Sequence, residues 1–204
     1  MGKTVPDPKS YFMGFIPSRD RLLLEMEAEA LREGIPIIGP VVGEFLHILI
    51  RTSKAKRILD LGTATGYSAI YLARAAGPDG MVVTVERDEF LSVRAWANIE
   101  RAGLGGCVDI QVGAAGRIMK KLKPPFDLIF LDIDKHEYDG VLPHCHRLLH
   151  NGGLLVCDNV SFATAAAFNR EVFNNGNWRT VHLFSFLPMH SPEDDALCLA
   201  MKVR

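Results

Sequence analysis

Strand-like and helix-like segments alternate along most of the chain, and this alternation limits the possible folds more than any other feature. From residue 57 onward, short runs that are apolar at nearly every position are each followed by a segment with helical periodicity. Apolar runs without a polar face are typical of strands that are buried on both sides. The expected strands are residues 58–61, 81–85, 108–112, 126–131 and 154–157, and the helices that follow them are 67–76, 88–102, 117–122, 138–150 and 163–174. This order predicts a parallel sheet with helices on both faces and right-handed crossovers.

Elements at the two ends of the chain complete this sheet. Residues 178–186 and 196–203 are expected to pair as an antiparallel hairpin at the sheet edge. Two helices are expected before the sheet, over residues 22–31, capped by Ser18 and ended by Gly34, and over 41–52, after Pro40. A chain of 204 residues has the length of one domain. We therefore predict a single α/β domain with a doubly wound, mostly parallel seven-stranded sheet: an arm (1–17), N-terminal helices (18–52) and an α/β core (53–204).

The composition excludes several classes of partner. Lys and Arg number 23 against 24 Asp and Glu, for a net charge of -1, whereas nucleic-acid and polybasic membrane binders need excess cation. The apolar runs fall well below the roughly 20 residues of a spanning helix, and residues 1–10 contain no apolar stretch of a secretory signal. The cysteines are widely spaced and form no C-x-x-C pair, which is typical of reduced thiols. We expect a cytoplasmic protein with no nucleic-acid or membrane partner.

Four of the expected parallel strands end in a carboxylate. These residues are Asp60, Glu86, Asp132 and Asp158. Ligands of doubly wound sheets bind beyond the carboxyl ends of the strands, near the point where the strand order reverses. Any one of the acids could instead cap the next helix or turn. Four at one edge favour a site that needs hydrogen-bond acceptors.

The loop after the first strand indicates what that site holds. It places Gly62 and Gly66 before a helix, where small residues let the backbone approach a ligand. It lacks the Gly-Lys-Ser/Thr of a Walker A loop and the G-x-G-x-x-G of a dinucleotide fold, and no G-x-S-x-G nucleophile turn occurs. Glu86 follows about 20 residues later, where an acid accepts hydrogen bonds from ribose in adenosine-binding folds.

A second group of polar residues suits a divalent cation. If strands 126–131 and 154–157 are neighbours, Asp132, Asp158 and the Asn159 amide converge from adjacent strand ends. Two carboxylates and a neutral oxygen suit a hard ion such as Mg²⁺. Lys135, one turn beyond Asp132, would reach the same opening, lose its proton more readily beside a metal ion and act as a base. The alternative interpretation of this run is a solvated charged turn.

Together these motifs resemble those of the cation-dependent O-methyltransferases, class I S-adenosylmethionine enzymes similar to catechol and caffeoyl-CoA O-methyltransferases. The resemblance covers roughly residue 34 to the C-terminus and implies the Rossmann-like methyltransferase fold. The matching segments, in order, are residues 59–68 (LDLGTATGYS), 84–86 (TVE), 132–138 (DIDKHEY), 152–153 (GG) and 158–160 (DNV).

The resemblance implies the roles of individual residues. Asp132, Asp158 and Asn159 match the ligands of Mg²⁺ or another divalent cation, Lys135 matches the general base, and Asp132 belongs to the catalytic set. The methyl acceptor is expected to be a small catechol-like or polyhydroxy aromatic compound, and only the resemblance favours a homodimer. The residues implied to bind S-adenosylmethionine are Asp60, Gly62, Thr63, Gly66, Tyr67, Ser68, Glu86, Gly113, Ala114, Ala115 and Asp132.

The chain departs from the family around the acceptor pocket. The family usually has a longer insertion before a Phe-Asn pair, whereas Phe168 and Asn169 follow Asn159 closely here. Its usual Asp-Gly between the last two strands is replaced by residues 191–195 (SPEDD). Two alternatives stay open: a non-catalytic S-adenosylmethionine-binding protein, against which the complete Asp-Asp-Asn set and Lys135 argue, and an NAD-linked oxidoreductase, against which the missing G-x-G-x-x-G argues.

Overall fold

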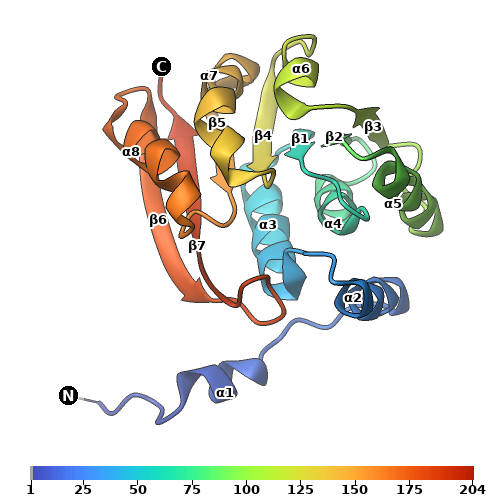
Figure 1. The fold of residues 1–204 in the computed structure, drawn as a ribbon, viewed down its shortest axis with the longest axis vertical. Helices are drawn as coiled ribbons and strands as arrows, with labels where there is room; N and C mark the ends of the chain where they lie inside the picture. The colour runs from blue at the N-terminus through green and yellow to red at the C-terminus, as the bar shows by residue number, and fades with distance from the viewer. Residues whose placement is uncertain (1) are drawn as a thin grey trace.

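The predicted strands form one twisted sheet, which the computed structural model describes over residues 2–204 (Figure 1). The strand order is β3-β2-β1-β4-β5-β7-β6. Strands β1 to β5 run parallel, and β7 is antiparallel to both β5 and β6, so the predicted fold class is confirmed. The strands are β1 (Arg57–Leu61), β2 (Met81–Glu86), β3 (Val108–Val112), β4 (Phe126–Leu131), β5 (Leu149–Cys157), β6 (Trp178–Phe186) and β7 (Asp194–Lys202).

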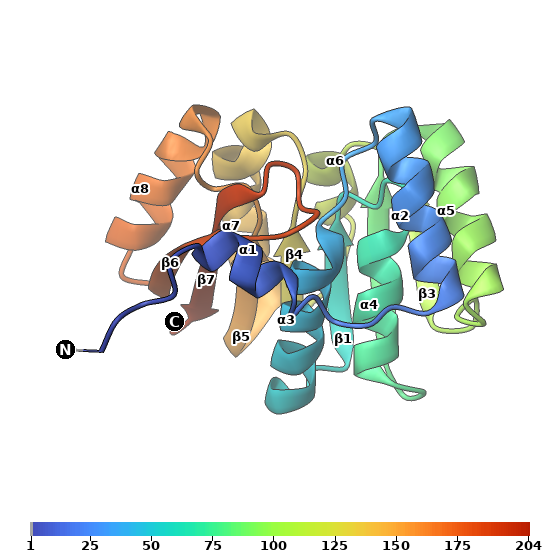
Figure 2. The same ribbon diagram turned by 90° about the horizontal axis from the view of Figure 1, so that it is seen from below.

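Helices cover both faces of the sheet (Figures 1 and 2). Successive strand residues point to opposite faces, so Ile58 belongs to one apolar core and Leu59 to the other. One core is shared with α2, α3, α4 and α5, and the other with α6, α7 and α8. The helices are α1 (Pro8–Met13), α2 (Arg21–Glu33), α3 (Gly39–Ser53), α4 (Tyr67–Ala76), α5 (Glu89–Arg101), α6 (Ala115–Met119), α7 (Tyr138–Leu148) and α8 (Ala166–Asn174), with short 3-10 helices η1 (Lys135–Glu137) and η2 (Ala163–Ala165).

Several element boundaries differ from the predicted ones. Helix α2 is capped by Asp20, whose carboxylate accepts from the backbone N–H of Leu23, and not by Ser18. Helix α6 covers residues 115–119 in place of 117–122. Helix α7 ends at residue 148 because Leu149 already pairs with Phe126 in the sheet. The changes at α2 and α7 reflect a hydrogen bond and a strand pairing that apolar periodicity does not encode.

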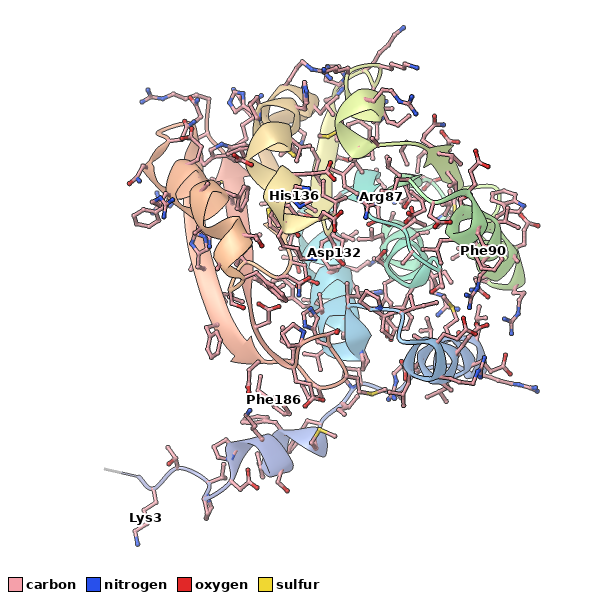
Figure 3. The ribbon with its side chains drawn as sticks, viewed as in Figure 1. Lys3, Arg87, Phe90, Asp132, His136 and Phe186 are labelled. Atoms are coloured by element: carbon pink, nitrogen blue, oxygen red, sulfur yellow. The ribbon has the colours of Figure 1, made fainter. Side chains whose placement is uncertain are left out.

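The N-terminal arm, predicted without regular structure, contains helix α1. Asp7 caps it by accepting from the backbone N–H of Ser10, and it buries no residue of its own. Lys9 contacts Asp194, and its Nζ lies 5.2 Å from the ring centre of Phe186, which Figure 3 shows beside α1. Met1, the first residue of the predicted arm, lies outside the described residues.

The lengths of the helices and the state of the cysteines can also be compared with the predictions. Over residues 2–204, every helix is too short or too polar to cross a bilayer. All four cysteines are free, and Cys145, Cys157 and Cys198 are buried.

The sheet brings the predicted acidic residues to one edge. In register, Leu61 of β1 pairs with Leu131 of β4, which pairs with Cys157 of β5. Asp132 and Asp158 therefore leave neighbouring strands at the same level, and Glu86 ends β2 beyond β1. The chain turns from the β3-β2-β1 half to the β4-β5 half at this edge, which is the switch point of the sheet.

Candidate active site

A cavity of about 240 Å³ lies at the carboxyl ends of the parallel strands. Its wall continues onto the segment between α2 and α3, at Pro36 and Ile37, and onto the β6–β7 loop, at His190 and Ser191. Figure 3 shows Asp132 near the middle of this part of the molecule. The predicted residues that line the cavity are Gly62, Glu86, Gly113, Ala114, Ala115, Asp132, Lys135, Asp158 and Asn159.

Glu86 forms the acidic side of this cavity. Its Oε2 accepts from the backbone N–H of Ala64 over 2.8 Å, and its Oε1 accepts from that of Asp88 over 3.0 Å. The carboxylate is thereby held against the loop that follows β1. Each of its oxygens has a second acceptor site, which a ligand hydroxyl in the cavity can fill.

The remaining residues predicted for the cofactor lie behind the cavity wall. They are Asp60, Thr63, Gly66, Tyr67 and Ser68. Asp60 Oδ2 accepts from Ser68 Oγ over 3.0 Å and from Thr84 Oγ1 over 2.8 Å, and Thr63 Oγ1 lies 2.6 Å from Thr84 Oγ1. These contacts hold the loop from beneath.

Two of these buried residues have shifted proton equilibria. Burial raises the pKa of Asp60 to about 7, although the hydrogen bonds from Thr84 and Ser68 oppose the shift. Tyr67 donates from its hydroxyl to Glu27 Oε1 over 2.6 Å, and burial followed by this hydrogen bond raises its pKa. Glu27 belongs to α2, so this bond ties the N-terminal helices to the loop.

The packing of the protein backbone requires a glycine at position 62. Its φ is +106°, and a Cβ there would lie 2.0 Å from the backbone oxygen of Asp132. Any side chain would push apart the ends of β1 and β4, because a contact this short is repulsive. The glycine brings the loop and Asp132 together in one wall.

Asp132 and Lys135 form the adjoining polar corner. Lys135, in the turn η1 after β4, donates from Nζ to Asp132 Oδ1 over 3.0 Å. Burial raises the pKa of Asp132 to about 6; the charge of Asp158 adds to the rise, and Lys135 opposes it. The side chain keeps 23% of its surface exposed at the cavity, so the carboxylate remains accessible to a ligand. Two carboxylates that face one cavity favour a cation between them.

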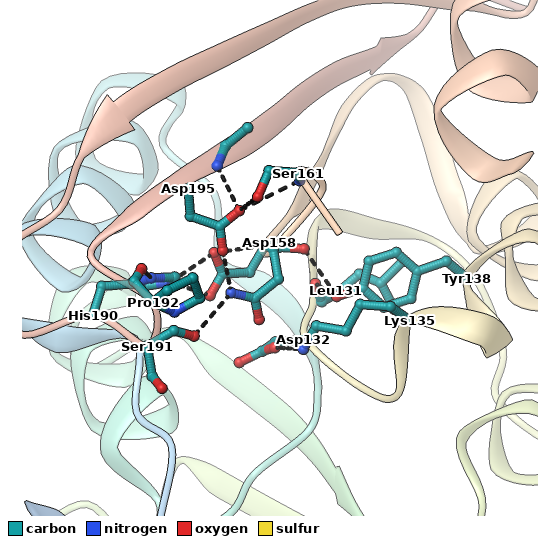
Figure 4. A network of polar contacts seen from close by, with 12 residues as sticks. Leu131, Asp132, Lys135, Tyr138, Asp158, Ser161, His190, Ser191, Pro192 and Asp195 are labelled. Carbon is teal, nitrogen blue, oxygen red and sulfur yellow. Dashed lines mark hydrogen bonds and ion pairs between the residues drawn. The ribbon is translucent and has the colours of Figure 1, made fainter. Parts of the chain in front are cut away.

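The Asn159 side chain is held by the β6–β7 loop and by Asp195 at the start of β7; Figure 4 shows Ser191 and Asp195 near Asp158. Its Nδ2 donates to Asp195 Oδ2 over 2.5 Å and to the Ser191 carbonyl over 3.2 Å. Asp195 is fully buried and also accepts from Ser161 and from the backbone N–H of Ala196. Since Oδ1 accepts three donors and Oδ2 accepts from the Asn159 amide, Asp195 acts as a support for Asn159.

Sequence reasoning missed His190, which lies against Asp158. Its Nε2 is 2.8 Å from Asp158 Oδ2 and 3.0 Å from Oδ1, and both side chains are 1% exposed. Burial alone would lower the pKa of His190, but the hydrogen bond and charge of Asp158 outweigh it, and the pKa is raised. A lone histidine in a loop gives no sequence signal; its only indication was that this loop departs from the family pattern.

The donor set at this corner fits a metal ion. Among the described residues, ligand atoms of Asp158, His190 and Asp195 lie within 4.8 Å of one another. Asp132 and Asn159 complete the oxygen-rich wall of the same cavity. Carboxylates and an amide oxygen are ligands of Mg²⁺ and Mn²⁺, and imidazole adds a ligand for heavier first-row ions.

Comparison with known proteins identifies the family of the chain. A family model described as O-methyltransferase matches residues 21–183. The chain belongs to the O-methyltransferase family. A catechol O-methyltransferase of Niastella koreensis is 38% identical to this O-methyltransferase over 156 residues, which cover 74% of this chain and 71% of that protein. One of Mycobacterium tuberculosis is 40% identical over 119 residues, covering 58% and 54%.

Solved structures agree with this assignment. The O-methyltransferase of Bacillus cereus in complex with SAH superposes with a TM-score of 0.86 at 26% identity, covering 95% of this chain and 96% of that one. TomG of Streptomyces achromogenes, in complex with SAM, gives 0.85 at 27% identity over 96% of each chain. The chain is thus an S-adenosylmethionine-dependent O-methyltransferase, and the predicted family is confirmed.

Proposed function

We propose that this O-methyltransferase is assisted by a divalent cation and methylates a hydroxyl of a small catechol-like or polyhydroxy aromatic acceptor. The observation that carries the proposal is the convergence of Asp132 and Asp158 from adjacent strand ends, with Lys135 Nζ 3.0 Å from Asp132. Relatives named catechol O-methyltransferase and caffeoyl-CoA O-methyltransferase support the class of acceptor.

S-adenosylmethionine would lie along the Glu86 side of the cavity. Glu86 would accept hydrogen bonds from the ribose hydroxyls, and the small residues Gly113, Ala114 and Ala115 would leave room for the adenine. The cofactor supplies a methyl group on a positively charged sulfonium. The carboxylate-rich wall stabilises that charge.

Asp132, Asp158 and Asn159 would hold the cation. When bound, a divalent ion draws charge from two neighbouring acceptor oxygens, so that their hydroxyl loses its proton at neutral pH. The protein fixes the amide of Asn159 through Asp195 and the carboxylate of Asp158 through His190. These supports keep the ligands in place before the acceptor arrives.

Lys135 would receive the acceptor proton. Its side chain lines the cavity, and in its neutral form Nζ can accept a proton from a hydroxyl held near Asp132. The oxygen freed of its proton could then take the methyl group, and the sulfonium would leave as the neutral thioether of S-adenosylhomocysteine. Most of the rate enhancement would come from positioning and charge.

The acceptor would enter past an apolar rim. Pro36, Ile37 and Ile133 line the same cavity as the polar corner. Phe162 is 42% exposed, and its ring centre lies 6.0 Å from Lys135 Nζ. Apolar and aromatic walls beside a charged corner suit an aromatic ring that carries hydroxyls on one side.

Assembly and location are further proposals. Helix α1 exposes Tyr11 and Phe12, and the residues just after it expose Phe15; the three rings pack on one another. Such a patch supports a homodimer, which light scattering would test. Four free cysteines support a reducing, cytoplasmic location.

The deciding experiment measures methyl transfer to 3,4-dihydroxybenzoate by mass spectrometry, with EDTA and with added Mg²⁺ or Mn²⁺. We expect cation-dependent methylation that Asp158→Ala abolishes, while calorimetry shows unchanged binding of S-adenosylhomocysteine. An unchanged rate in that variant would remove the metal role. Cofactor binding without methylation of any acceptor would favour a non-catalytic protein, and stabilisation by NAD alone would contradict the proposal.

A further inference from the structure

The loop between β6 and β7 builds one side of the proposed cation site. It places His190 against Asp158, and its Ser191 carbonyl accepts from the Asn159 amide. This is the segment where the sequence departs from the usual Asp-Gly of the family.

The loop is fixed before any ligand binds. The backbone N–H of Leu187 donates to the Glu193 carbonyl over 2.6 Å, and that of His190 donates to the Leu187 carbonyl over 3.0 Å. The loop also lies directly on Gly39, where a Cβ would come within 2.9 Å of the Met189 backbone. A loop bonded to itself and packed on a helix start holds its histidine in one position.

The hydrogen bonds of His190 determine which nitrogen can offer a lone pair to a cation. Nδ1 lies 2.6 Å from the carbonyl oxygen of Pro192, which only accepts hydrogen bonds. Nδ1 therefore carries a hydrogen. Without a cation, Nε2 also carries a hydrogen and donates it to Asp158; a bound cation would replace that hydrogen and take the lone pair of Nε2. Metal-binding histidines characteristically donate from the other ring nitrogen to a carbonyl or carboxylate.

The distances also suit a shared cation. Adjacent ligands of an octahedral ion, each at about 2.1 Å from the metal, are about 3.0 Å apart. His190 Nε2 lies 2.8 Å and 3.0 Å from the two oxygens of Asp158. Asp195, the other carboxylate within reach, is occupied by the amide of Asn159, by Ser161 and by the N–H of Ala196.

We infer that His190 Nε2 is an additional ligand of the cation held by Asp132, Asp158 and Asn159, an inference that rests on the proposed metal site. One imidazole and three oxygen ligands suit a borderline first-row ion better than Mg²⁺. The site thus prefers Co²⁺ or Fe²⁺ to Mg²⁺. The opposing assignment, in which His190 only orients Asp158 through a hydrogen bond, predicts that removal of the imidazole changes this preference little.

Pulsed electron paramagnetic resonance of the Mn²⁺-loaded protein tests ligation directly. A coordinated imidazole gives ¹⁴N modulation of the Mn²⁺ signal. We expect it in the wild type and in His136→Ala, a matched control that removes an exposed histidine next to Lys135. We expect His190→Ala to bind Mn²⁺ without this modulation. If the alanine variant does not fold, His190→Asn, which has no Nε2, is measured in its place.

Calorimetry tests the preference. In His190→Ala, the Co²⁺ affinity should fall about tenfold or more while the Mg²⁺ affinity changes less, because only the softer ion gains from imidazole. Bound Mn²⁺ without ¹⁴N modulation, modulation that survives in His190→Ala, or equal losses for both ions would overturn the inference and leave the proposed metal site intact. If the wild type and Asp158→Ala both bind no divalent ion, the proposed metal site fails as well.

Discussion

The Asp195 carboxylate holds the Asn159 side chain in one orientation. The Asn159 Nδ2 donates to Asp195 Oδ2 and to the carbonyl oxygen of Ser191. With both amide hydrogens used in this way, Oδ1 is the atom left to serve as an acceptor or a ligand. Asp195 therefore orients a proposed cation ligand from behind, where it is itself completely buried.

Replacing Asp195 should weaken cation binding. We expect Asp195→Ala to lower the Mn²⁺ affinity by about 10–100-fold, the usual cost of removing a residue that orients a metal ligand. Calorimetry measures the affinity, and thermal unfolding verifies that the variant is folded. Asp194→Ala is the control, because Asp194 is exposed and its side chain contacts Lys9. Equal losses in the two variants would contradict a specific role for Asp195.

Lys135 should matter for the rate and not for cofactor binding. We expect Lys135→Met to lower kcat by about 10²–10⁴-fold at neutral pH, the usual contribution of a general base. Its rate should recover as the pH rises toward the pKa of the acceptor hydroxyl, which is about 10 for a free phenol and lower beside a cation, because the acceptor then ionises without the base. Lys123→Met, at an exposed position, should behave like the wild type. A variant rate that is low at every pH would assign Lys135 to binding instead.

The sheet could be predicted from the sequence because its central strands are buried on both faces and are therefore apolar at nearly every position. Strands β3 and β4 and helix α4 have the predicted bounds. Boundaries set by single contacts were missed. Asp20 caps α2 through one side-chain hydrogen bond, and β5 begins at Leu149 through pairing with Phe126. Neither contact changes the hydrophobic periodicity of the sequence.

The sequence predicted those site residues that lie at the ends of strands. Asp132 and Asp158 come together because β4 and β5 are neighbours. His190 could not be predicted, since it reaches Asp158 across 32 residues through a loop whose path depends on its own hydrogen bonds. Asp60, which sequence alone places at the same edge, lies beneath the loop because its carboxylate bonds Ser68 and Thr84.

Glu86 should control cofactor affinity. We expect Glu86→Gln to weaken S-adenosylhomocysteine binding by about 10–100-fold, since a hydrogen bond to a charged group contributes about 1.5–3 kcal/mol. In the wild type, the two carboxylate oxygens accept from the backbone N–H groups of Ala64 and Asp88. The substitution turns one of these oxygens into an NH₂ group, which cannot accept. Calorimetry measures the affinity, with Glu89→Gln, three residues further on in the exposed first turn of α5, as control. Unchanged affinity would place the ribose elsewhere.

Asp60 should make the stability of the cofactor-free protein depend on pH. Burial raises its pKa to about 7, so the native state keeps a proton that the unfolded chain releases near pH 4. The unfolded state binds fewer protons in this range, and the free energy of unfolding therefore falls as the pH rises from about 4 to about 7. Above the folded pKa both states are ionised and the contribution is constant.

Asp60→Asn removes this titration. Relative to the wild type, its free energy of unfolding should increase between pH 4 and pH 8 by up to about 4 kcal/mol, because each pKa unit corresponds to about 1.36 kcal/mol. Urea unfolding at a series of pH values measures the difference, and a constant penalty from the new amide cancels in that trend. Asp79→Asn, at an exposed turn, should show no trend. A difference that stays constant across the series would show that Asp60 is ionised throughout, with its charge balanced inside the fold.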